Sequence, residues 1–125
     1  MDQLKVHIIR HTQKETEEIL AADFIYHFHN FKVLDMDNSK LLSVLLTTII
    51  NGGIKKIIIN FNTLKFIDST GIGVLINIAK MIRTKDGDLV LLNIPEMIDD
   101  IFKPVNLKQF INMFQNIEEA KSFFN

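Results

Sequence analysis

The sequence predicts one α/β domain over residues 1–125, with a mostly parallel sheet of four to five strands and about four helices. Strand-like segments alternate with segments of helical periodicity, which favours parallel strands joined by right-handed crossovers. Ile57-Ile58-Ile59 is an unbroken β-branched run, typical of a strand covered on both faces. The chain is 47% hydrophobic and has no cysteine, so its core must form without disulfides.

The N-terminal segments predict two strands. Residues 4–11 alternate apolar and polar side chains, which predicts a half-buried strand. The polar stretch at 12–19 predicts a loop or a short helical turn, and the aromatic stretch at 24–28 predicts a second strand. The apolar face of the first strand is expected to consist of Leu4, Val6 and Ile8.

A first helix is expected over 39–51. Asp37 or Asn38 can cap its N-terminus. Gly52-Gly53 can end it, because glycine readily adopts the left-handed conformation. The side chains expected to be buried include Leu41, Leu42, Leu45 and Ile49.

The central segments predict strand, helix and strand in turn. A strand is expected over 54–61, a helix from about 70 to 85, and a further strand over 89–94 after a turn at Asp86-Gly87-Asp88. The polar stripe of this helix consists of Asn77, Lys80 and Thr84. Its opposite, buried face consists of Ile72, Leu75, Ile78, Ala79 and Ile82.

The C-terminal segments predict two helices around a last strand. A proline favours the first turn of a helix at 96–102, and alternation over 109–114 indicates a short strand. Asn116 and Glu119 have the spacing of a capping box, which predicts a terminal helix over 117–124.

The stretch FIDSTGIGVL places Asp68-Ser69-Thr70 between a strand and a helix. Open α/β sheets bind ligands and partners at the carboxyl ends of their strands. Ser69 is expected to cap the helix through its side-chain oxygen, and Asp68 adds negative charge near the positive helix end. Gly71 and Gly73 each cost about 0.5–1 kcal/mol relative to alanine, which favours a reason for them beyond stability. Close approach of another protein is one such reason, and strand–helix packing is the alternative.

This stretch resembles the STAS domain, and more narrowly the stand-alone anti-sigma factor antagonists of bacteria. Their hallmark is an Asp-Ser-Ser/Thr-Gly-Leu/Ile-Gly run after an Ile-rich strand and before an amphipathic helix. The resemblance covers roughly residues 23–115 and implies a STAS-like fold. In that family a partner kinase phosphorylates the serine directly after the aspartate. The counterpart here is Ser69, with Thr70 as the second choice of acceptor.

The resemblance also implies a partner surface. The family has an acidic loop, often Gly-Glu-Leu-Asp, before the first helix, and the matching stretch here is Lys32-Val33-Leu34-Asp35. The Leu-Asp pair is retained, whereas the glycine and the glutamate are not. The residues that the resemblance places at the partner interface are Asp35, Asp68, Ser69, Thr70, Gly71, Ile72 and Gly73.

The function that the resemblance implies is partner switching. The unphosphorylated protein binds an anti-sigma factor that is also a serine kinase of GHKL type, and this frees a sigma factor. Phosphorylation of Ser69 releases the protein, and a PP2C-type phosphatase resets it. The chain is then a bacterial, cytoplasmic phosphoprotein that is not itself an enzyme and needs no cofactor.

Two alternatives remain open at this stage. The first is an unphosphorylated STAS scaffold, or a small-ligand-binding subunit, in a signalling or transport assembly. The second is a hydrolase built on Ser69, which lacks a nearby base and the GxSxG elbow.

Composition and charge narrow the possible partners. Fourteen basic residues nearly balance fifteen acidic ones, so no nucleic-acid partner is expected. No apolar run is long enough to span a bilayer, so no membrane insertion is expected. His27 and His29 share one side of a strand, with His7 and His11 on a possible neighbour. They could bind zinc or copper, but half-exposed strand histidines with some pH sensitivity are the favoured interpretation, and no metal is expected.

Overall fold

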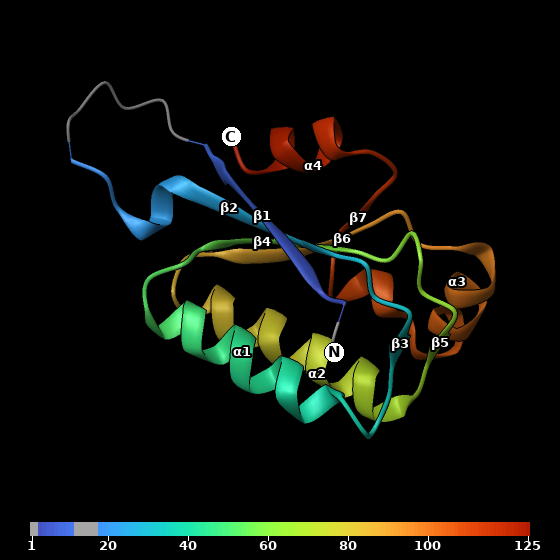
Figure 1. The fold of residues 1–125 in the computed structure, drawn as a ribbon. Helices are drawn as coiled ribbons and strands as arrows, with labels where there is room; N and C mark the ends of the chain where they lie inside the picture. Colours follow the sequence, from blue (N-terminus) through green and yellow to red (C-terminus); the bar gives the residue numbers. More distant parts are fainter. Residues whose placement is uncertain (1–2, 12–17) are drawn as a thin grey trace.

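The computed structural model describes residues 3–11 and 18–125 of the chain (Figure 1). The polar segment at 12–19, expected to be a loop or helical turn, lies outside the described residues except for its last two, which are in neither helix nor strand. The strands are β1 (Lys5–Arg10), β2 (Phe24–His29), β3 (Val33–Leu34), β4 (Lys56–Asn60), β5 (Phe66–Ile67), β6 (Asp88–Leu92) and β7 (Met113–Phe114). The α-helices are α1 (Ser39–Asn51), α2 (Ser69–Arg83), α3 (Glu96–Phe102) and α4 (Ile117–Phe123). Short 3₁₀ turns occur at Ala21–Asp23, Lys103–Val105 and Leu107–Gln109.

The strands of the described residues form a mostly parallel main sheet, as the sequence predicts. The order of this five-stranded sheet is β1-β2-β4-β6-β7. The strands β2, β4, β6 and β7 pair in parallel, and only β1 is antiparallel. Ile57, Ile58 and Ile59 of the central strand β4 are all buried, which is the reason for its unbroken β-branched run.

Helices cover the two faces of the main sheet unequally. The helices α1 and α2 pack side by side under one face, and α4 lies on the opposite face (Figure 1). The larger core lies under the first face and includes Phe61, Leu75 and Phe102. The smaller core, built around Ile25, Ile58 and Ala120, lies under α4. The α3 helix and the two-stranded sheet of β3 and β5 stand together at one end of the molecule (Figure 1).

The first strand is more exposed than its alternating pattern predicts. It forms an outer edge of the main sheet, and Val6 and Ile8 are 43% and 54% exposed. The prediction of a half-buried strand is therefore wrong for these side chains. A strand at the sheet edge, beyond the helix layer, can alternate apolar and polar side chains like a half-buried strand. Its apolar side chains nevertheless stay exposed, because no helix covers them.

Two further predictions differ in detail from the structure. In α1 the buried apolar side chains are Leu42, Leu46 and Ile50, whereas Leu41, expected inside, is 59% exposed. The strand expected over 109–114 is reduced to β7, which pairs with Leu91 and Leu92. The 3₁₀ turn at Leu107–Gln109 takes up the first predicted residue, and Phe110 after it has helical dihedral angles, φ −102° and ψ −32°, so the extended segment starts later than predicted.

Candidate functional site

The N-terminus of α2 is capped by Asp68. Its backbone is extended, with φ −111° and ψ −177°, and its side chain accepts a hydrogen bond from the Gly71 N–H at 3.0 Å. The sequence predicts this role for Ser69, which is instead the first helical residue. Both residue types are good caps, and here the carboxylate satisfies the free N–H of the first turn.

The Asp68 carboxylate joins three separate donors. Oδ1 accepts from the Thr70 hydroxyl and from the Gly71 N–H, and Oδ2 accepts from the Met36 N–H at 2.9 Å. The Thr70 hydroxyl, followed by these backbone N–H groups, holds the pKa of Asp68 below its ordinary value. The carboxylate is therefore charged, and the Thr70 hydroxyl proton is already directed to an acceptor.

A two-stranded parallel sheet brings the Asp35 loop to this helix end. Leu34 in β3 pairs with Ile67 in β5, and the Asp68 N–H donates to the Leu34 carbonyl at 3.2 Å. Met36, the next residue after Asp35, then reaches Asp68. The structure thus brings together Asp35 and the Asp68-Ser69-Thr70 turn, which the family resemblance placed in one site.

The loop between β3 and α1 is held by its own side chains. The Asn38 side chain accepts from the Asp35 N–H at 2.9 Å and donates to the Val33 carbonyl at 2.8 Å. Asn38 is the N-cap residue of α1, as expected, but its side chain makes no capping bond because it is used in this loop. Asp35 itself accepts from the Asp37 N–H at 3.0 Å.

The remaining predicted site residues differ in exposure. Ser69 and Thr70 are exposed, and no hydrogen bond of the Ser69 hydroxyl is found within the described part of the chain. Gly71 and Ile72 are buried. Gly73 is half-buried, and a Cβ built on it would have no neighbour within 4 Å. The Ser69 residue is consequently exposed, with its hydroxyl free of hydrogen bonds to the described residues.

Exposed apolar side chains beside this turn were not identified from the sequence. Met36 is 72% exposed and Phe66 is 48% exposed, and Val33, which pairs with Phe66, is exposed as well. The signal was available, because Met36 stands between two aspartates and Phe66 begins FIDSTGIGVL. Exposed apolar side chains that gather on one surface are a common mark of a protein interface.

The histidines gather elsewhere on the sheet. His7, His27 and His29 lie on β1 and β2 with ring centroids 4.4–5.9 Å apart, whereas His11 lies near Lys56, whose Nζ donates to the His11 carbonyl at 2.7 Å. No group of three or more His, Cys, Asp or Glu residues in the described ranges 3–11 and 18–125 is placed to hold a metal ion.

These features define an α/β domain that presents a hydroxyl at a helix N-terminus, beyond the carboxyl end of a parallel strand. The STAS domain family model matches residues 2–120, so the chain belongs to the STAS domain family. A Thermotoga maritima protein assigned to the anti-sigma factor antagonists is 28% identical over 90 residues, covering 71% of this chain and 80% of that protein. The anti-sigma-B factor antagonist of Staphylococcus aureus is 27% identical over 94 residues, covering 73% of this chain and 87% of that protein.

Solved structures show the same fold. A crystal structure of a Thermotoga maritima protein that has been assigned as an anti-sigma factor antagonist has a TM-score of 0.76 at 25% identity. The match covers 80% of this chain and 86% of that chain. The unphosphorylated anti-sigma factor antagonist SpoIIAA has a TM-score of 0.65 at 21% identity, covering 95% and 96% of the two chains. The phosphorylated Bacillus SpoIIAA has a TM-score of 0.64 at 22% identity, covering 97% and 100%. Among the residues that the structure describes, no helix is both long and apolar enough to cross a membrane.

Proposed function

We propose that this chain is a cytoplasmic anti-sigma factor antagonist that works by partner switching. The unphosphorylated form binds an anti-sigma factor of the GHKL serine kinase type and thereby frees a sigma factor. The kinase phosphorylates Ser69 and the complex dissociates, and a PP2C-type phosphatase restores the binding form. In this scheme the chain is a substrate and a binding partner, and it is not an enzyme.

The exposed Ser69 hydroxyl at the first position of α2 is the observation that carries the proposal. A kinase can reach this oxygen without unfolding the domain. A phosphoserine carries a charge of about −1.5 to −2 and three acceptor oxygens. The unpaired N–H groups of a helix N-terminus tolerate such an anion, so the fold survives the modification.

The surroundings of Ser69 explain how one phosphate could end binding. The rim of Val33, Met36 and Phe66 offers apolar area to a partner, while charged Asp68 lies directly beside the acceptor serine. A dianion added between them must be desolvated when the partner docks, and it stands next to a like charge. Binding then weakens without any large change in shape.

The names of the relatives support the same role. Two proteins that match about 70% of this chain are named or assigned as anti-sigma factor antagonists. SpoIIAA is represented by both an unphosphorylated and a phosphorylated structure, and this chain resembles the two almost equally. A fold of this kind is therefore compatible with both states of a switch.

The direct test is phosphorylation by a candidate kinase. The protein is incubated with ATP and a GHKL-type kinase encoded near its gene, and the intact mass is measured. The expected result is a gain of one phosphate in the wild type and in Thr70→Ala, and no gain in Ser69→Ala. Subsequent treatment with a PP2C-type phosphatase should restore the original mass.

The same experiment separates the alternatives. Phosphate on Ser69→Ala but not on Thr70→Ala would move the acceptor to Thr70. Stable binding without phosphate would favour the unphosphorylated scaffold. An absence of both binding and phosphate with every such kinase would contradict the proposed function.

A further inference from the structure

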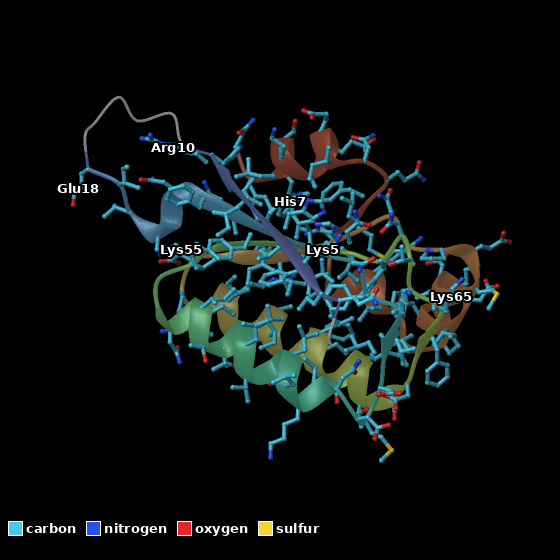
Figure 2. The ribbon with its side chains drawn as sticks, in the orientation of Figure 1. Lys5, His7, Arg10, Glu18, Lys55 and Lys65 are labelled. Carbon is cyan, nitrogen blue, oxygen red and sulfur yellow. The ribbon has the colours of Figure 1, made fainter. Side chains whose placement is uncertain are left out.

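Three histidines share one face of the sheet at its β1 edge. His7 pairs directly with His27 in the β1–β2 register. His27 and His29 follow Ile25 at two-residue steps, so they point to the same face as Ile25, which belongs to the smaller core near α4. The ring centroids are 5.9 Å apart for His7 and His27, 4.4 Å for His7 and His29, and 5.3 Å for His27 and His29. We call His7, His27 and His29 the histidine trio; Figure 2 labels His7 on β1.

The contact between His27 and Asn60 favours a neutral imidazole. The Asn60 Oδ1 accepts from the Asn62 N–H at 3.0 Å, which fixes the orientation of the amide. The amide nitrogen of Asn60 then lies 3.3 Å from the His27 Nε2. A nitrogen that receives an amide N–H must present its lone pair, so the proton of neutral His27 is on Nδ1. Protonating Nε2 would set two donors against each other.

His29 is also arranged against protonation. Its Nε2 is sealed from solvent and has no hydrogen-bond partner among the described residues. Both ring nitrogens of a charged histidine are donors, so the cation would leave a buried N–H without an acceptor.

The charged groups around the trio act in the same direction. Lys5 on β1 lies opposite His29 and lowers the pKa of His29, after burial and His7. Burial, followed by His29 and His7, lowers the pKa of His27 to about 4. On the neighbouring β4, Asn60 is uncharged, and Lys56 at the far end pairs in register with Asp88 of β6.

The helix on the same face supplies no counter-charge to the trio. Glu118 and Glu119 of α4 are exposed, and Lys121 is a cation. None of these three contributes to the lowered pKa values of His27 and His29. Among the described residues, protonation of the trio therefore meets Lys5 and the Asn60 amide, and no carboxylate contributes to the pKa of His27 or His29.

We propose that the histidine trio is an acid-sensitive latch that holds β1 on the sheet while neutral and releases it when protonated. β1 is an edge strand that pairs only with β2 within the described residues. Separation of β1 from β2 moves His7 away from the other two rings and lets water reach all three. The latch is independent of the Ser69 switch.

The sign and size of the effect follow from His27. A folded-state pKa of about 4, below the ordinary 6.5, gives a contribution to stability that is complete above pH 6.5 and is lost as the pH falls towards 4. For this one group, the equilibrium constant for opening at pH 5 would be about 30-fold higher than at pH 7.5. Because the ring is half-exposed, solvent screening reduces the expected increase to about tenfold.

Hydrogen exchange at single amides tests the latch. Amide exchange rates are measured at pH 7.5 and 5.0 in buffer with a chelator. Each rate divided by the intrinsic rate of that amide gives an opening constant, which is compared between β1 and the central strands β4 and β6. The wild type is expected to show about tenfold easier opening of β1 at pH 5.0, with a smaller change in β4 and β6. The variant His7→Gln/His27→Gln/His29→Gln should lose this pH dependence, and the matched control His11→Gln should keep it.

Several outcomes would overturn the latch. One is an equal pH dependence in the triple variant and the wild type, and another is opening of β1 only together with β4 and β6. Should the triple variant not fold, the NMR titration of His27 in the wild type decides: a midpoint near 4 supports the proposal, and one above 6 refutes it. Zinc that protects β1 at pH 7.5 when the chelator is omitted would assign the trio to a metal instead.

Discussion

Phosphorylation of Ser69 is expected to weaken binding of the partner kinase about a hundredfold. That change corresponds to a loss of about 3 kcal/mol of binding free energy, which suffices for a switch. The loss arises because a dianion beside the charged Asp68 must be desolvated under a partner that approaches the exposed rim of Met36 and Phe66. Ser69→Asp carries a single negative charge and is expected to weaken binding at least about tenfold.

A matched variant separates charge from bulk in this experiment. Ser69→Asn has nearly the shape of Ser69→Asp without its charge, and Ser69→Ala removes only the hydroxyl. Calorimetric titration with the kinase in the absence of ATP should rank affinity as Ala, then Asn, then Asp, then phosphoserine. Ser69→Asp that binds as tightly as the wild type would contradict the switch. Equal losses for Asn and Asp would mean that bulk, and not charge, ends binding.

The elements that the sequence predicted well are those with local periodicity. The helix α1 occupies the predicted residues 39–51. The five apolar residues predicted on the buried face of α2 are all buried. In α2 the apolar residues recur in consecutive turns, and their burial follows from the helical repeat. In α1 the same repeat predicted the bounds of the helix but wrongly placed Leu41 inside. The buried central strands were equally clear from their continuous apolar runs.

The features that the sequence did not reveal depend on distant contacts. The strands β3 and β5 have two residues each, too few to show any period, and they form only because Leu34 meets Ile67. The exposure of Val6 and Ile8 depends on which strand lies at the edge of the sheet, and alternation does not contain that information.

The N-cap of α2 also depends on a distant contact that the sequence does not reveal. Aspartate and serine are both preferred N-caps, so propensity alone does not decide between Asp68 and Ser69. The structure decides through the N–H of Met36, which comes from a loop 32 residues earlier and donates to Asp68. The motif predicted a set of site residues, and the structure gives these residues different contacts. Asp68 caps the helix and anchors the Asp35 loop, which leaves the Ser69 hydroxyl free.

Gly71→Ala is expected to lower the stability of the domain by about 2 kcal/mol, a fall in Tm of about 5–10 °C. A Cβ on Gly71 would lie 2.7 Å from the Leu34 carbonyl oxygen, 2.9 Å from the Leu34 Cγ and 3.0 Å from the Ile67 Cγ1. The first of these is backbone, and the same oxygen accepts the Asp68 N–H. The added methyl group must therefore push β3 and the Asp35 loop away from the cap. Thermal unfolding followed by circular dichroism measures the loss.

Gly73→Ala is the matched control, two residues along the same helix. The space around Gly73 is open, so alanine there should raise stability by about 0.5–1 kcal/mol through helix propensity. Opposite signs for the two substitutions would show that Gly71 is fixed by internal packing, whereas Gly73 is not. If Gly73→Ala gains stability and loses affinity for the kinase, the partner approaches the helix at this point. Gly71→Ala as stable as the wild type would mean that the contact between β3 and the α2 cap is loose, and that Asp68 does not need the Asp35 loop beside it to present Ser69.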